Sequence, residues 1–273
     1  MASRTSRCDG FHPVTYDWRR RTFCPLERPN ARLRLFCFPY AGAGASAYRS
    51  WAALVPETVE VRAVQLPGRE SRLREACATT MPALVEDVTA GIQPLLDKPF
   101  ALFGHSLGAL LAFETARRLA SVPGAGPAHL FASGRRAPHL PARSRPIADL
   151  EEGAFLDEIR KRYDGVPREV LEEPDLLALL LPALRADIAS IESYRLEAAA
   201  PLECPITVYG GADDLEARDD ELSAWRVHTR GAFGLRMFAG SHFFIRSSSA
   251  AVTADLSGVL RSIVAGRRED GPR

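Results

Sequence analysis

A serine at position 106 is placed where its hydroxyl could act as a nucleophile. It stands at the centre of the stretch Gly104-His105-Ser106-Leu107-Gly108. A serine on a sharp strand-to-helix corner takes strained backbone angles, and the residues two before and two after it come close together. Glycine at both places removes the Cβ atoms that would collide. The pattern predicts a nucleophile elbow, and a plain Gly-Ser turn is the alternative.

The sequence on either side of Ser106 contains the elements that such a corner needs. Residues 100–103, Phe-Ala-Leu-Phe, are apolar without alternation, which is typical of a strand buried on both faces of a parallel sheet. The run from Ala109 to Ala120 is rich in alanine and leucine and favours a buried helix. A strand before the serine and a helix after it make the match to the elbow pattern much more specific than the three fixed residues, Gly104, Ser106 and Gly108, would be alone.

A serine hydroxyl is a weak nucleophile, so it needs a base, and the base needs an acid to orient it. In folds with this elbow the order along the chain is serine, acid, histidine. Four of the six histidines precede Ser106, open a strand or come before any strand-terminal acid: His12, His105, His129 and His139. Of the others, His228 falls in an expected helix, whereas His242 follows a strand in a Gly-Ser-His turn. We expect His242 as the base, and His105 as a residue that only shapes the elbow.

Two neighbouring aspartates are candidates for the acid. Asp213 and Asp214 close the stretch Gly-Gly-Ala-Asp-Asp directly after the strand expected at 205–209, and Asp219 and Asp220 lie slightly beyond. Strand periodicity does not separate the first two. One of them should face the histidine and the other solvent or the backbone.

A loop of small residues, 40–46 (Tyr-Ala-Gly-Ala-Gly-Ala-Ser), directly follows the strand expected at 33–38. Such residues let backbone N–H groups approach a ligand closely. We interpret the loop as half of an oxyanion hole, the other half being the N–H of Leu107. A phosphate loop or a plain connection is the alternative, but the loop lacks the Gly-Lys-Ser/Thr and G-x-G-x-x-G patterns of nucleotide sites.

The remaining elements alternate between strands and helices, which predicts an α/β fold with a mostly parallel central sheet flanked by helices. Further strands are expected at 59–64, 129–132 and 234–238, and helices at 79–96 and 249–265. Residues 140–195 are expected to be a helical lid insertion, interrupted at Pro182, and ordinary packing on the sheet is the alternative. We expect a loose N-terminal arm over residues 1–30 and a disordered tail over 266–273.

Length and composition restrict the function classes. A chain of 273 residues suits a single α/β domain, and a net charge of +1 gives no case for nucleic acid or a charged membrane surface. No leader-like or membrane-spanning apolar run is evident, so we expect a cytoplasmic protein. Five scattered cysteines without pairing motifs suggest free thiols in a reducing compartment: Cys8, Cys24, Cys37, Cys77 and Cys204.

Seven motifs, taken together, carry a resemblance that covers residues 33–264. They are Phe-Cys-Phe-Pro-Tyr-Ala-Gly-Ala-Gly-Ala-Ser (36–46), Gln-Leu-Pro-Gly-Arg (65–69), Phe-Gly-His-Ser-Leu-Gly-Ala (103–109), Ser-Gly-Arg-Arg-Ala-Pro (133–138), Leu-Pro-Ala-Leu-Arg-Ala-Asp (181–187), Tyr-Gly-Gly-Ala-Asp-Asp (209–214) and Gly-Ser-His-Phe-Phe (240–244). The chain resembles the type II thioesterases, the stand-alone editing enzymes of polyketide and non-ribosomal peptide synthesis. The resemblance implies an α/β-hydrolase fold and identifies residues 140–195 with the family's lid.

The resemblance also implies roles for individual residues. The family's acid stands just before a proline, which corresponds to Asp214; here Leu215 stands where the proline is common, and Asp213 remains a weaker candidate. The family's oxyanion donors correspond to the backbone N–H groups of Ala41 and Leu107. Members often have histidine where this chain has Tyr40, so that side chain is not expected to be essential.

The activity implied is hydrolysis of acyl thioesters held on the phosphopantetheine arm of an acyl or peptidyl carrier protein, without metal or cofactor, by a monomer. Carrier proteins are typically acidic, so a basic cluster could meet one, although a solvated arginine face explains it equally well: Arg135, Arg136, Arg143 and Arg145. A general esterase or lipase for small esters and a non-catalytic carrier-binding module are the competing hypotheses.

Overall fold

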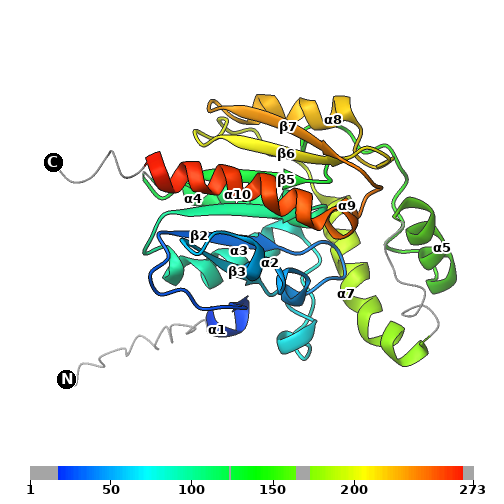
Figure 1. Ribbon diagram of the computed structural model, residues 1–273. Coiled ribbons are helices and arrows are strands. Elements are labelled where there is room, and N and C mark those ends of the chain that lie inside the picture. The colour runs from blue at the N-terminus through cyan, green and yellow to red at the C-terminus, as the bar shows by residue number, and fades with distance from the viewer. Residues whose placement is uncertain (1–17, 123, 164–172, 267–273) are drawn as a thin grey trace, which may run out of the picture.

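The computed structural model describes residues 18–122, 124–163 and 173–266, and its centre is a seven-stranded sheet in the order β1-β3-β2-β4-β5-β6-β7 (Figure 1). The strands are β1 (Thr22–Phe23), β2 (Leu33–Phe38), β3 (Val59–Val64), β4 (Phe100–His105), β5 (His129–Ser133), β6 (Ile206–Gly211) and β7 (Phe233–Phe238). Every neighbouring pair is parallel except β1 with β3, which is antiparallel. The predicted mostly parallel sheet is confirmed. The carboxyl ends of its parallel strands, β2 to β7, all lie on the same side of the molecule.

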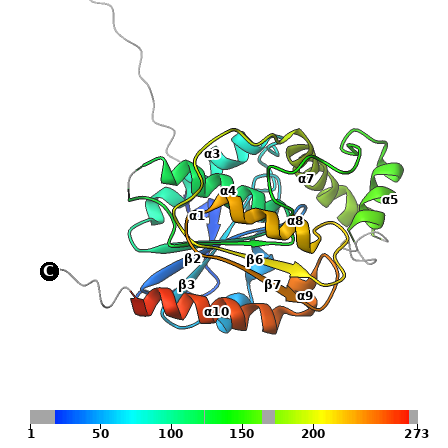
Figure 2. The same cartoon turned by 90° about the horizontal axis from the view of Figure 1, so that it is seen from above.

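Helices cover both faces of this sheet. They are α1 (Trp18–Arg21), α2 (Trp51–Leu54), α3 (Met81–Ile92), α4 (Leu107–Ala120), α5 (Glu152–Arg162), α7 (Pro174–Ser193), α8 (Asp219–Ser223), α9 (Phe244–Ser247) and α10 (Ser249–Gly266), with 3-10 turns η1 (Ala45–Tyr48), η2 (Glu70–Arg72), η3 (Gln93–Leu95) and η4 (Ala224–His228). Figure 2 shows α3 and α4 on one side and α10 on the other. Two hydrophobic cores result, one beneath α3 and α4 and one beneath α2 and α10.

The central strands are buried along their whole length, which explains their uninterrupted apolar sequences. All residues of β2, β4 and β5 are buried, because helices pack on both faces. Strand β7, at the sheet edge, is only partly buried. Within the described residues, none of the helices is both long enough and apolar enough to cross a membrane.

Helices α5 and α7 lie together at one end of the sheet (Figure 1) and share a third core built around Phe155, Ile159 and Ile188. The predicted break at Pro182 is wrong, because α7 runs through this residue. A proline inside a helix removes one N–H and crowds the carbonyl four residues earlier. Apolar residues on both sides of Pro182 pack in the third core and hold the helix together: Leu177, Leu181, Leu184 and Ile191.

The terminal segments differ in how much of them is described. The loose arm expected over residues 1–30 falls partly on residues 1–17, outside the described residues, but the following residues form α1 and the edge strand β1. The tail expected from residue 266 also lies outside the described residues after Gly266, the last residue of α10. Among the described cysteines, Cys24, Cys37, Cys77 and Cys204 are free.

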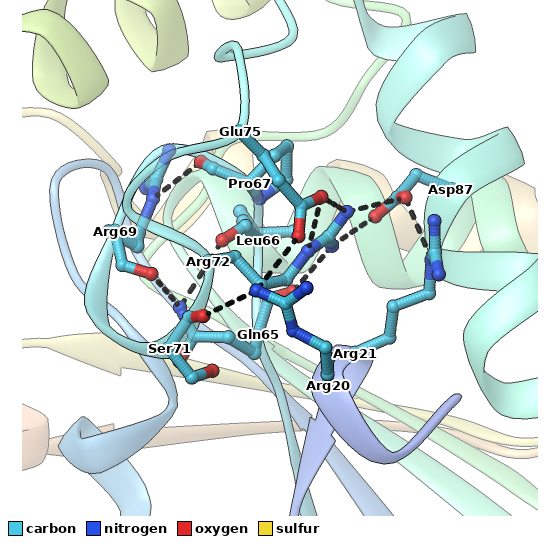
Figure 3. Close-up of polar contacts among 10 residues, drawn as sticks. All are labelled: Arg20, Arg21, Gln65, Leu66, Pro67, Arg69, Ser71, Arg72, Glu75 and Asp87. Carbon is cyan, nitrogen blue, oxygen red and sulfur yellow. Dashed lines mark hydrogen bonds and ion pairs between the residues drawn. The ribbon is translucent and has the colours of Figure 1, made fainter. Parts of the chain in front are cut away.

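Buried charges fix the segment that follows β3. Arg72 has only 2% of its side chain exposed and pairs with Asp87 of α3 and with Glu75. It also donates to the carbonyl of Gln65 at 2.9 Å, and Arg21 reaches the same Asp87 from α1 (Figure 3). A guanidinium with this many acceptors fixes the loop geometry as well as satisfying its charge. Residues 65–72 are therefore a rigid support for the loop after β2, which contacts Gln65 and Arg69.

We predict that Arg72→Met lowers the free energy of unfolding by about 3 kcal/mol, because removing one partner of a buried ion pair leaves uncompensated charge. Arg160→Met is the control, since Arg160 pairs with Asp157 on the exposed surface of α5; it should change the free energy by less than about 0.5 kcal/mol. Urea unfolding followed by circular dichroism measures both. Equal losses for the two variants would contradict this assignment.

Candidate active site

The elbow predicted at Ser106 is present and strained. Ser106 has φ 54° and ψ −114° between the end of β4 and the start of α4. A Cβ at Gly104 would lie 1.9 Å from the carbonyl oxygen of Gly108, and one at Gly108 would lie 2.2 Å from that of Phe38. The Ser106 N–H donates to the carbonyl of Ser133 at 2.8 Å. A Cβ atom at position 104 or 108 would overlap a backbone carbonyl group, so the geometry requires glycine at both positions.

Three side chains from three loops meet at the carboxyl edge of the sheet. His242 Nε2 lies 3.1 Å from Ser106 Oγ, and His242 Nδ1 lies 2.9 Å from Asp214 Oδ2. All three residues are buried, with 6% or less of each exposed. With Nδ1–H donating to the carboxylate, Nε2 is free to accept the serine proton.

The structure separates the two aspartates that strand periodicity left open. Asp214 is buried and its second carboxylate oxygen accepts the N–H of Glu216 at 2.9 Å. Asp213 is exposed, and its N–H donates to the carbonyl of Gly240 at 3.0 Å. That bond ties the loop after β6 to the loop after β7, which carries His242. Leu215, at the place where proline is common, projects into solvent.

Among the described residues, the other histidines take no part in this chain of hydrogen bonds, although the His105 ring packs against that of His242 with 5.1 Å between the centroids. His105 is fully buried with Nδ1 3.0 Å from Ser133 Oγ, and burial lowers its pKa well below the usual value, so its ring stays neutral. His139 and His228 bond to each other at 2.8 Å. His129 bonds to the hydroxyl of Thr207. That His105 only shapes the elbow stays a prediction.

A small apolar cavity of about 50 Å³ opens onto Ser106 and His242. Its other lining residues come from the loop after β2, from the end of α5, from α7 and from the residue after His242: Tyr40, Ala41, Ile159, Tyr163, Leu184, Ile188, Ile191 and Phe243. Burial raises the pKa of both tyrosines, so their phenols remain neutral at physiological pH. Helices α5 and α7 therefore form the wall over the serine.

The expected oxyanion donors border the same place. Leu107 is the first residue of α4, so its N–H is among those that a helix leaves without an internal partner. Ala41 lines the cavity beside Ser106. It lies in the turn Tyr40–Ala43, in which Gly42 has φ 78° and the Ala43 N–H donates to the Tyr40 carbonyl at 3.0 Å. No group of three potential metal ligands occurs among the described residues.

Comparison with known proteins decides the family. Residues 33–260 match the family described as "Thioesterase domain". The chain belongs to the thioesterase family. It is 42% identical over 235 residues to the gramicidin S biosynthesis protein GrsT of Aneurinibacillus migulanus, covering 86% of this chain and 91% of that protein.

Solved thioesterase structures share the fold. The RedJ thioesterase from the prodiginine pathway of Streptomyces coelicolor superposes with a TM-score of 0.79 at 39% identity, covering 85% of this chain and 92% of that one. The type II thioesterase BorB from the borrelidin biosynthetic cluster gives a TM-score of 0.80 at 33% identity, covering 90% and 98%. These likenesses confirm the predicted α/β-hydrolase fold and the resemblance to type II thioesterases.

Two residues near the site were present in the motifs of this thioesterase but received no role from the sequence. Asp187 and Arg69 form a buried ion pair next to the loop that carries Ala41. A signal for Asp187 was available, because it follows Leu184 by three residues and precedes Ile191 by four, on the apolar face of α7. An acid at such a position must have a buried partner.

We predict that Gly104→Ala destabilises the fold by more than about 3 kcal/mol or prevents its formation, because the methyl group overlaps the backbone of Gly108. Gly258→Ala is the matched control: no other element lies within 4 Å of the place that its methyl group would take in α10, and it should stabilise the helix by about 0.5–1 kcal/mol. Soluble yield and denaturant midpoints measure both changes. A Gly104→Ala protein as stable as the wild type would contradict the elbow packing.

Proposed function

We propose that this thioesterase hydrolyses acyl thioesters on the phosphopantetheine arm of carrier proteins, with Ser106 as nucleophile, His242 as general base and Asp214 as the acid that orients it. The observation that carries the proposal is the buried hydrogen-bond chain from Asp214 through His242 to Ser106. It ends at an apolar cavity in a member of the thioesterase family. A nucleophile, its base and an orienting group within hydrogen-bond reach are the arrangement that activates serine.

In the first half-reaction, Ser106 Oγ attacks the thioester carbonyl carbon while its proton passes to His242 Nε2. The carbonyl oxygen takes the negative charge, and the N–H groups of Ala41 and Leu107 donate to it. When the intermediate collapses, the C–S bond breaks and His242 returns the proton to the departing sulfur. The products are a free pantetheine thiol and an acyl ester on Ser106.

In the second half-reaction, a water molecule attacks the acyl ester, and His242 again takes the proton. Collapse of the second intermediate breaks the bond between the acyl carbon and Ser106 Oγ, and the proton returns to the serine. A thiol with a pKa near 8.5 leaves more readily than an alkoxide, so the same machinery acylates faster from a thioester than from an ester. The released product is the free carboxylic acid.

The names of the relatives support a carrier-bound substrate. GrsT is named for gramicidin S biosynthesis, and RedJ and BorB for prodiginine and borrelidin biosynthesis. Editing of aberrant acyl groups in polyketide or non-ribosomal peptide synthesis is the corresponding proposal for this chain. The apolar lining of the cavity, with Leu184, Ile188 and Ile191 from one helix, suits an acyl chain.

The arginine cluster proposed to meet an acidic carrier is mostly engaged within the protein. Arg136 and Arg143 both pair with Glu221, at 3.0 and 3.4 Å. Arg143 also donates to the carbonyl of Leu215, next to Asp214, at 2.7 Å. Arg145 keeps 73% of its side chain exposed, in a 3.7 Å pair with Glu158. Within the cluster, Arg145 is thus the side chain that we propose for contact with a carrier.

We predict that Asp214→Asn lowers kcat for an acyl-pantetheine thioester by about 10⁴-fold, because the amide favours the wrong histidine tautomer. Asp213→Asn is the matched control and should leave kcat unchanged, since its side chain is exposed and its loop contact uses the backbone. Steady-state thiol release measures both variants. The reverse pattern would transfer the acid's role to Asp213.

Selectivity tests the substrate class. With acyl-pantetheine thioesters and oxygen esters of the same acyl group, we expect the thioester to be hydrolysed at least about 10-fold faster, because its leaving group is better. Both activities should disappear in Ser106→Ala, which controls for background hydrolysis. A strong preference for the oxygen ester would favour a general esterase, and no turnover of either would favour a binding module.

A further inference from the structure

The orientation of the Ala41 N–H depends on the turn that contains it. The carbonyl of Tyr40 accepts the N–H of Ala43, and Gly42 has the positive φ that the third residue of a type II turn requires. In a trans peptide the C=O and the N–H point in opposite directions. Because the Tyr40 carbonyl points across the turn, the Ala41 N–H of the same peptide points away from it. The donor is therefore aimed only while the turn stays closed.

Asp187 of α7 reaches this turn. Its Oδ2 accepts the N–H of Gly42 at 2.8 Å, and no part of the residue is exposed. That N–H belongs to the central peptide of the turn, which joins Ala41 to Gly42 and whose reversal converts a type II turn into a type I turn. The reversal leaves the Tyr40 carbonyl in place, so what the bond gives the donor is position: it ties the residue that carries the donor, Ala41, to α7. A buried carboxylate that accepts this N–H holds the peptide in one orientation, because the reversed peptide would present a carbonyl oxygen to it.

Arg69 fixes the carboxylate in turn. Its guanidinium bonds to both oxygens of Asp187, at 2.5 and 2.9 Å, and only 3% of the arginine side chain is exposed. The same guanidinium donates to the carbonyl of Ala43 at 3.2 Å. Two parallel N–H···O bonds set the position of a carboxylate more sharply than a single contact can. Arg69 thus holds the turn through the carbonyl of Ala43, and Asp187 holds it through the N–H of Gly42.

The support continues into the rigid segment after β3. Gln65 donates from Nε2 to the carbonyl of Arg69 at 3.1 Å, and its Oε1 accepts the N–H of Ala45 at 3.1 Å. Arg72, three residues from Arg69, is held by Asp87 of α3 (Figure 3). The loop that carries Ala41 therefore rests on side chains that are themselves immobilised.

We infer that Asp187 and Arg69 are positioning residues that aim the Ala41 N–H at the oxyanion. The inference rests on the proposed function of Ser106 and extends it to two residues that do not touch the reacting atoms. A buried ion pair adds little net stability compared with apolar residues of the same volume. The pair contacts the backbone of Gly42 and Ala43, so its role is to position the turn and not to stabilise the fold. Because α7 also supplies Leu184 and Ile188 to the cavity, one helix contacts the acyl site and orients the donor.

The test compares a ligand that forms an oxyanion with one that does not. In a trifluoromethyl ketone analogue of an acyl-pantetheine thioester, Ser106 Oγ bonds to the carbonyl carbon, its proton passes to His242, and the ketone oxygen becomes an oxyanion. A thioether with CH₂ in place of the carbonyl occupies the same site without charge. Inhibition constants and isothermal titration measure the two affinities, with kcat measured alongside.

For Asp187→Ala we expect the trifluoromethyl ketone to bind about 10²-fold more weakly, with kcat falling in step, because an oxyanion donor is displaced. Asp187→Asn keeps the shape and an acceptor oxygen but loses the charge, so it should lose at least about 10-fold in both. Thioether affinity should change by less than about threefold in either variant. In the double variant Asp187→Ala with Arg69→Ala, the losses should not add, since the two residues act as a unit.

Glu60→Gln is the matched control, because Glu60 forms a comparably buried pair with Arg34 at the amino ends of β2 and β3. It should lower the unfolding midpoint yet leave the ratio of the two affinities at the wild-type value. Folded Asp187 variants with wild-type affinity for the ketone, or with equal losses for ketone and thioether, would overturn the inference. A wild-type protein that neither hydrolyses thioesters nor binds the ketone would overturn the proposed function itself.

Discussion

The backbone contact between Gly104 and Gly108 is the constraint that holds the whole site in place. It allows β4 to turn into α4 within one residue, so that Ser106 stands at φ 54° above the carboxyl edge of the sheet. Parallel strands bring their carboxyl ends to the same edge, and the loops after β6 and β7 deliver Asp214 and His242 there. The strain at Ser106 is sustained because two fully packed elements hold its neighbours.

Buried charges complete what the sheet begins. Strands and helices place the ends of loops, but a loop of glycines and alanines such as 40–46 has few side chains with which to hold itself. In this thioesterase, the missing contacts come from polar groups elsewhere in the sequence: Asp187 on α7, with Arg69 and Gln65 after β3. These contacts bridge up to 145 residues of sequence. They link the wall of the cavity to the backbone proposed to bind the oxyanion.

Much of this was predictable from the sequence, for identifiable reasons. Uninterrupted apolar runs marked the buried strands, and the chain-order rule led to His242. Strand periodicity could not separate Asp214 from Asp213, because both follow the same strand and only the loop's hydrogen bonds decide which is buried. The preference for Asp214 came from the resemblance to type II thioesterases. The break expected at Pro182 was wrong because packing against α5 outweighs the local cost of proline. Arg69 and Asp187 are 118 residues apart in the sequence, so no local sequence pattern could predict that they form a pair.

In the proposed mechanism Ser106 carries the acyl group between the two half-reactions, and this intermediate can be trapped. The enzyme is mixed with an acyl-loaded carrier protein, quenched with acid within one turnover, and the modified peptide is mapped by mass spectrometry. We expect an acyl ester on Ser106 that is absent from Ser106→Ala. An acyl group found on a cysteine such as Cys77, or thioester hydrolysis that persists in Ser106→Ala, would contradict the mechanism.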